Sequence, residues 1–96
     1  MPSLPQLRKQ IDLLDNQIVA LLNHRLKLAE KIGGLKLHNG DKVYNPSRER
    51  ELLSRLCGRL RGPLLESELR IIYQRILQAS RAHQKRVFLK SKKRRS

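Results

Sequence analysis

Little in this sequence points to a fold held together by cross-links or by bound metal. Cys57 is the one cysteine among 96 residues, so no intramolecular disulfide can form and no CxxC pair exists. The three histidines are scattered without the spacing of metal ligands. These absences argue against a disulfide-stapled mini-protein and against a small zinc module, and we expect no metal site.

Aromatic residues and long apolar runs are also scarce. Tyr44, Tyr73 and Phe88 are the only aromatics, which is poor for a β-sandwich core and for stacking on nucleic-acid bases. No apolar run approaches 18 residues, and the first residues carry charges and prolines where a signal peptide needs an apolar segment. We therefore expect one small helical domain in the cytoplasm, without a membrane segment.

Positive charge is what the sequence has in excess. Lysine and arginine number 22 against 8 acidic residues, for a net charge of +14, which implies an anionic partner. Seven positive charges lie in residues 85–96, which leaves +7 on residues 1–84. From Lys90 onward the charge run has no apolar periodicity, so we predict a domain over 1–89 and a disordered basic tail over 90–96.

The N-terminal third predicts one long helix. Ser3 and Gln6 have the spacing of a capping box, and apolar residues then recur every three or four positions until Asn39-Gly40. A helix of about 35 residues is about 50 Å long, whereas a compact domain of this size has a radius of gyration of about 12–13 Å. Such a helix cannot bury its apolar stripe within one globular chain, so we expect a dimer.

Two further helices are predicted after a loop. Asn45 and Pro46 are a favourable N-cap and first helical residue for a short second helix, whose stripe extends to Leu60 and which Gly62-Pro63 should end. A third helix is expected from near Leu64 through Val87. The predicted fold class is all-α, with one long, one short and one medium helix.

Polar side chains occupy the apolar faces of all three predicted helices. On a helical wheel with about 100° per residue, Arg25 and Lys36 fall within about 20° of the centre of the first apolar stripe, and Arg8 lies at its edge near Asp15. The second and third helices also carry polar residues on or beside their apolar stripes. Over the three helices, these residues are Arg8, Arg25 and Lys36 on the first helix, Arg48 and Glu49 on the second, and Ser80 and Gln84 beside Tyr73 on the third.

Two interpretations of this pattern remain open. Burying an unpaired charge costs several kcal/mol, so the inward cations need anions. Glu49 and Asp15 could supply them in a buried salt-bridge network that fixes helix register. Alternatively, the helices form a polar pocket that is one or two negative charges short and that a dicarboxylate ligand completes. The surplus of cations favours the pocket.

The same residues carry a family resemblance. The segments LRKQIDLLDNQIVALLNHRLKLAEKIGGLK, VYNPSRERELLSRL and GPLLESELRIIYQRILQASRAHQ resemble the all-helical class of chorismate mutases over residues 4–84. The ending ASRAHQ looks most like the mutase domain of bifunctional chorismate mutase/prephenate dehydratase proteins. The resemblance implies an intertwined homodimer with active sites shared between chains. It also implies conversion of chorismate to prephenate in aromatic amino-acid biosynthesis, without a cofactor.

The resemblance further assigns roles to the cationic residues. Arg25 and the partner subunit's Arg8 would clamp the two substrate carboxylates, because guanidinium groups bind carboxylates through paired hydrogen bonds. Arg48 would add positive potential and Ser80 a further hydrogen bond. Holding the flexible substrate in this way would remove orientational entropy from the barrier.

The remaining site residues would contact the ether and hydroxyl oxygens of the substrate. Lys36 and Gln84 look like the catalytic donors to the ether oxygen, which gains negative charge as its C–O bond breaks. Glu49 would accept a hydrogen bond from the substrate hydroxyl. Asn45 stands where many relatives carry Asp, and we include it among the substrate-binding residues.

Two other functions are compatible with parts of the pattern. An isochorismate-pyruvate lyase on the same scaffold would use the same cations and would form salicylate rather than prephenate. A basic helical protein could instead bind nucleic acid through residues 85–96, with an affinity that falls steeply with salt and survives loss of the pocket residues. No aromatic residues interleave the charges of that tail to stack on bases, which favours a solvated tail.

Overall fold

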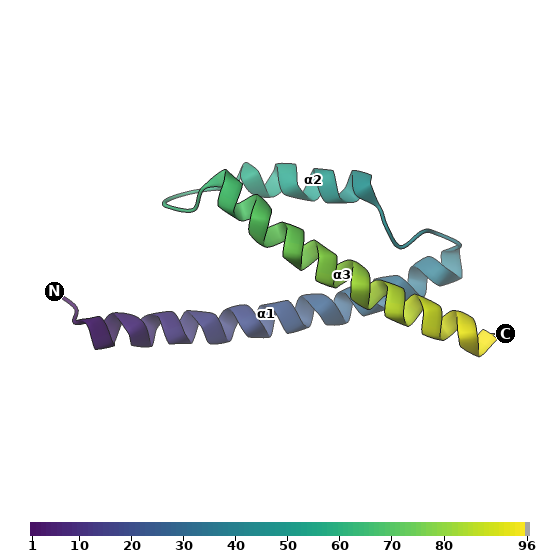
Figure 1. Ribbon diagram of the computed structural model, residues 1–96, viewed down its shortest axis with the longest axis horizontal. Coiled ribbons are helices and arrows are strands. Elements are labelled where there is room, and N and C mark those ends of the chain that lie inside the picture. Colours follow the sequence, from purple (N-terminus) through teal and green to yellow (C-terminus); the bar gives the residue numbers. More distant parts are fainter. Residues whose placement is uncertain (96) are drawn as a thin grey trace.

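The computed structural model describes residues 1–95, with side chains through Lys90, and these residues form three helices and no strand. The helices are α1 (Leu4–Asn39), α2 (Pro46–Cys57) and α3 (Glu66–Arg95). α1 and α3 run in the same direction and cross in their C-terminal halves, while α2 lies beside the first half of α3 (Figure 1). The predicted all-α fold of three helices is confirmed.

The predicted starts of α1 and α2 are also confirmed. The Ser3 hydroxyl accepts the Gln6 backbone N–H at 3.3 Å, and the Gln6 side chain accepts the Ser3 N–H at 2.8 Å, so the capping box is complete. Asn45 caps α2, its Oδ1 accepting the Arg48 backbone N–H at 3.0 Å. Gly40 ends α1 with a φ of 76°, a left-handed conformation that glycine adopts without steric cost.

The second helix is shorter than predicted. α2 ends at Cys57, so Leu60 lies in the loop. Gly62 and Pro63, which were expected to end the helix, lie in the same loop. The Gly58 N–H donates to the Ser54 carbonyl four residues before it, but the Arg59 N–H donates to the Leu56 carbonyl only three residues before it. The α-helical pattern therefore stops at Gly58, which matches the low helix propensity of glycine. α3 correspondingly begins at Glu66 rather than near Leu64.

The basic C-terminal segment also differs from its predicted description. α3 continues without a break past Lys90 to Arg95, whereas a frayed or disordered tail was expected over residues 90–96, of which Ser96 lies outside the described residues. Lysine and arginine have high helix propensity, and cations at a helix C-terminus interact favourably with its dipole. The limit of the domain at residue 89 stays a prediction.

A single chain is elongated and leaves much of α1 without cover. The radius of gyration is 17.3 Å and the extents are 63 × 26 × 15 Å, against about 12–13 Å expected for a compact domain. The N-terminal half of α1 carries an apolar stripe of half-exposed side chains, namely Leu7, Ile11, Leu14 and Ile18. Within the described residues no helix has a stretch apolar enough to cross a lipid bilayer.

The crossing of α1 and α3 depends on a glycine. A Cβ atom at Gly33 would lie 2.5 Å from the Gln84 carbonyl oxygen and 2.8 Å from its Cα, so the two backbones touch there. At the neighbouring Gly34, the nearest atom to such a Cβ is a Val87 methyl group at 4.0 Å. Gly33 therefore sets how closely the two helices approach at Gln84.

We predict that Gly33→Ala destabilises the protein by about 1–3 kcal/mol, because the methyl group meets backbone atoms that cannot rotate away. Gly34→Ala is the matched control and should be neutral or stabilising by up to about 1 kcal/mol, since it removes a glycine from a helix without a clash. Thermal unfolding followed by circular dichroism measures both. Equal midpoints for the two variants would contradict the close crossing.

Candidate functional site

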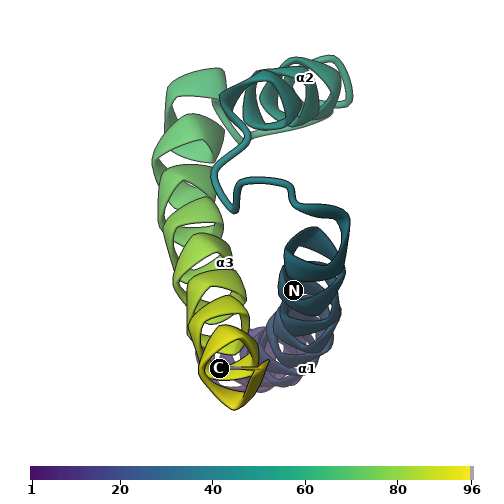
Figure 2. The ribbon, with the colours of Figure 1, turned by 90° about the vertical axis from the view of Figure 1, so that its right-hand side faces the viewer.

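A cavity of about 370 Å³ opens between the three helices and the loop of residues 40–45. In Figure 2, α3 extends from the side of α2 to the side of α1, and this loop spans the space between α1 and α2. Apolar side chains such as Leu28, Ile32 and Leu77 contribute to its lining. Seven of the eight predicted site residues line it as well: Arg25, Lys36, Asn45, Arg48, Glu49, Ser80 and Gln84.

Arg8 is the predicted residue that the single chain does not bring to the cavity. It lies on α1 seventeen positions before Arg25, about 25 Å away along the helix axis. Its apolar neighbours on α1, Leu7 and Ile11, are half-exposed, and Arg8 does not line the cavity. Within one chain, Arg8 and Arg25 therefore cannot contact the same small ligand.

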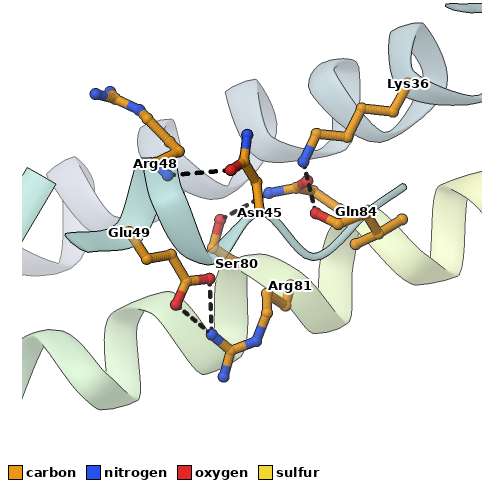
Figure 3. A network of polar contacts seen from close by, with 8 residues as sticks. Lys36, Asn45, Arg48, Glu49, Ser80, Arg81 and Gln84 are labelled. Atoms are coloured by element: carbon orange, nitrogen blue, oxygen red, sulfur yellow. Dashed lines mark hydrogen bonds and ion pairs between the residues drawn. The ribbon is translucent and has the colours of Figure 1, made fainter. Parts of the chain in front are cut away.

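Lys36 points from α1 toward the loop. Its Nζ donates to the Val43 carbonyl at 2.5 Å, in a part-buried position (Figure 3). An ammonium group has three donors, and this bond uses one of them. The contact fixes the end of the side chain at the cavity while leaving donors for a ligand.

The amide of Gln84 is buried and only half satisfied. Gln84 and Ser80 are 8% and 6% exposed, and the Gln84 Nε2 donates to the Ser80 hydroxyl at 3.2 Å. The Gln84 Oε1 has no hydrogen-bond partner among the described residues. Rotating the amide by a half-turn would let its oxygen accept from Ser80 and place its NH₂ group at the unpartnered position. Because buried polar groups are rarely left without partners, this side chain indicates a site for a ligand.

Glu49 forms an ion pair with Arg81 in the wall of the cavity. The Nη1 of Arg81 donates to both carboxylate oxygens, at 2.6 and 2.7 Å, across the contact between α2 and α3 (Figure 3). The ring of Tyr44 lies 5.1 Å from the Arg81 guanidinium carbon. Arg81 was missed by the sequence analysis, although it follows Leu77 by four residues and so shares its face of the helix.

Asn45 and Arg48 are placed at the rim. The Asn45 side-chain oxygen is used as the helix cap, a role that Asn and Asp fill about equally well. The Arg48 guanidinium donates to Glu51 at 3.1 Å in an exposed pair and points away from the other labelled side chains in Figure 3. Arg48 thus lies at the rim of the cavity, and its guanidinium group is held in an exposed ion pair.

The electrostatics of the cavity are dominated by cations. Arg25, Lys36 and Arg81 line it against the carboxylate of Glu49, and Arg48 lies at its rim with its guanidinium paired to Glu51. Among the side chains through Lys90, Arg25 has no ion-pair partner. A small, partly apolar cavity with surplus positive charge and spare donors is suited to a small organic anion with more than one negative charge.

The family follows from the sequence as a whole. The chain belongs to the chorismate mutase type II family, whose model matches residues 7–85. It is 36% identical over 91 residues to a bifunctional chorismate mutase/prephenate dehydratase of Aquifex aeolicus, covering 91% of this chain and 25% of that protein. It is 29% identical to a chorismate mutase of Methanocaldococcus jannaschii, covering 85% and 84% of the two chains. The chain thus spans about a quarter of the length of the bifunctional relative.

Solved structures agree with this membership. The crystal structure of chorismate mutase from Helicobacter pylori in complex with prephenate matches with a TM-score of 0.81 at 37% identity, over 88% of this chain and 91% of that chain. A conserved hypothetical protein from Pyrococcus furiosus matches with a TM-score of 0.71 at 36% identity, over 88% and 97%. The resemblance stated from the sequence is therefore confirmed.

Proposed function

We propose that this chain is a chorismate mutase, which rearranges chorismate to prephenate by a [3,3] sigmatropic shift in the cavity between the helices. The observation that carries the proposal is the meeting of Arg25, Lys36 and Gln84, from two different helices, at one cavity with surplus positive charge. The substrate is a dianion with an ether bridge and a hydroxyl group. Its carboxylates match the cations, and its ether oxygen matches the donors.

The two donors account for acceleration of the chemical step. The breaking C–O bond leads the forming C–C bond, so negative charge grows on the ether oxygen as the transition state is approached. Lys36 and Gln84 would donate to that oxygen, and they would bind it more strongly in the transition state than in bound chorismate. The Lys36 contact with Val43 keeps one donor in place before substrate arrives, and the hydrogen bond between the Gln84 amide and Ser80 keeps the other.

The cations account for binding and orientation. Arg25 would hold one carboxylate from within the chain, and Arg48 would add positive potential once its side chain turns from Glu51 toward the cavity. Ser80 would supply a further hydrogen bond, and Asn45 would support the rim as the cap of α2. Clamping the substrate at both carboxylates brings the bond-forming carbons together and removes orientational entropy from the barrier.

We propose that the active form is a homodimer whose sites are shared between chains. The exposed apolar stripe at the start of α1 needs cover, and a second copy offers an identical stripe. In an antiparallel arrangement of two long helices, the partner subunit's Arg8 would approach the cavity of the first chain. It would then clamp the second carboxylate, which Arg25 alone cannot reach.

Product identification tests the function. The purified protein is incubated with chorismate and, in parallel, with isochorismate, the loss of absorbance is followed, and the products are separated. Prephenate as the only new product supports the proposal. Salicylate and pyruvate from isochorismate would assign the related lyase reaction instead, and a chain that changes neither substrate while remaining helical and dimeric would refute both.

A further inference from the structure

We infer that Arg81 is a positioning residue of this site: it holds the Glu49 carboxylate against α3 and so keeps it from pairing with the cations that bind substrate. The inference rests on the proposed function, because it assigns a purpose to Arg81 within that reaction. Neither the sequence pattern nor the family resemblance had singled out this residue.

The geometry of the pair is the first support. One nitrogen of Arg81 donates to both oxygens of Glu49, at 2.6 and 2.7 Å, and the two residues are 32 positions apart in the chain. Their side chains are 35% and 20% exposed, so the pair is partly screened from water. Tyr44 lies over the guanidinium at 5.1 Å, a distance at which an aromatic face attracts a cation. The arginine is therefore held by the ring as well as by the carboxylate.

The surroundings of Glu49 are the second support. Its carboxylate is the one negative group lining a cavity that Arg25 and Lys36 also line, with Arg48 at the rim. A carboxylate free to move in such a cavity would pair with one of these cations and cancel the charge that attracts the substrate. In Figure 3 the Glu49 carboxylate points toward Arg81 and away from Lys36.

The pair leaves Glu49 able to act on the substrate. An ionised carboxylate has about four acceptor positions, and Arg81 occupies one on each oxygen. The remaining positions can accept the hydroxyl of chorismate. Arg81 thus gives Glu49 a fixed orientation without removing its capacity to accept.

A double-mutant cycle between Arg81 and Glu49 tests this role. Arg81→Met, which keeps most of the side-chain length and removes the charge, should lower kcat/KM about tenfold, mainly through a higher KM. In the Glu49→Gln background the same substitution should change kcat/KM by less than about twofold, because no carboxylate is left to hold. Arg75→Met is the matched control. Arg75 lies on the same helix, is exposed and bonds Gln78, so its loss should change kcat/KM by less than about twofold in either background.

The same cycle is measured by calorimetric titration with prephenate, which needs no turnover, and the same coupling is expected. If Arg81→Met lowers kcat/KM and prephenate affinity by the same factor in the parent and in the Glu49→Gln variant, Arg81 acts on the ligand directly. That result would overturn the inference. A lower melting temperature with unchanged kcat/KM and unchanged affinity would overturn it too, because the pair would then be structural only. A parent chain that binds prephenate with this coupling but does not convert chorismate would refute the proposed function and leave the positioning role supported. A parent chain that neither binds prephenate nor converts chorismate would overturn both the proposed function and the positioning role.

Discussion

Arg8→Ala and Arg25→Ala are each expected to lower activity by about a hundredfold or more, because each removes one clamp from every site. Unfolded together and refolded as a mixture, they should recover about a quarter of the parent's activity. The two positions are about 25 Å apart on α1 and cannot reach one ligand from the same chain. In a mixed dimer, one site has lost both clamps and the other has kept both.

The numbers follow from random pairing. About half of the dimers are mixed and one of their two sites is intact, which gives the expected quarter. Lys9→Ala is the matched control, since Lys9 is the exposed neighbour of Arg8 on α1, and it should keep the parent's activity. If the refolded mixture stays inactive while gel filtration shows normal dimers, the shared site is wrong and Arg8 is a surface cation.

Gln84→Glu is expected to make activity depend strongly on acid. A neutral amide donates at any ordinary pH, whereas a carboxyl group donates only when protonated. Gln84 is buried beside Ser80, so the new group would lie within hydrogen-bond distance of the position expected for the ether oxygen. The variant should lose about a hundredfold in kcat near neutral pH and regain much of it as the pH falls.

The pH profile of kcat measures this effect. Gln78→Glu is the control, because Gln78 is exposed on the same helix and outside the cavity, and its profile should follow that of the parent. Parallel profiles for Gln84→Glu and the parent would contradict the donor role of Gln84.

Sequence periodicity predicted most of the cavity because inward polar residues on a helix are conspicuous. Arg25 and Lys36 share one face of α1, and Ser80 and Gln84 are one turn apart on α3, so two correctly placed helices are enough to bring them together. The contact of Gly33 with the backbone of Gln84 is visible only in the structure, because it depends on how closely the two helices approach.

Other features depend on how the helices are rotated against one another, which no single helical wheel contains. The Glu49 pair with Arg81 requires α2 to lie antiparallel to α3 in one register. The outward turn of Arg48 has a different cause, because it depends on Glu51, three residues further along the same helix. The end of α2 at Cys57 was not predicted because Gly58 and Gly62 have the same low helix propensity, and the sequence does not indicate which of them ends the helix.

Mapping where prephenate binds tests most directly whether the cavity is the site. Backbone amide shifts of the labelled protein are recorded by NMR during titration with prephenate. The shifts should be largest around Arg25, Lys36, Glu49 and Gln84, with a further group near Arg8, and should saturate at one prephenate per chain. Shifts confined to the basic end of α3 beyond Lys85, growing without saturation and disappearing with salt, would contradict a specific site in the cavity.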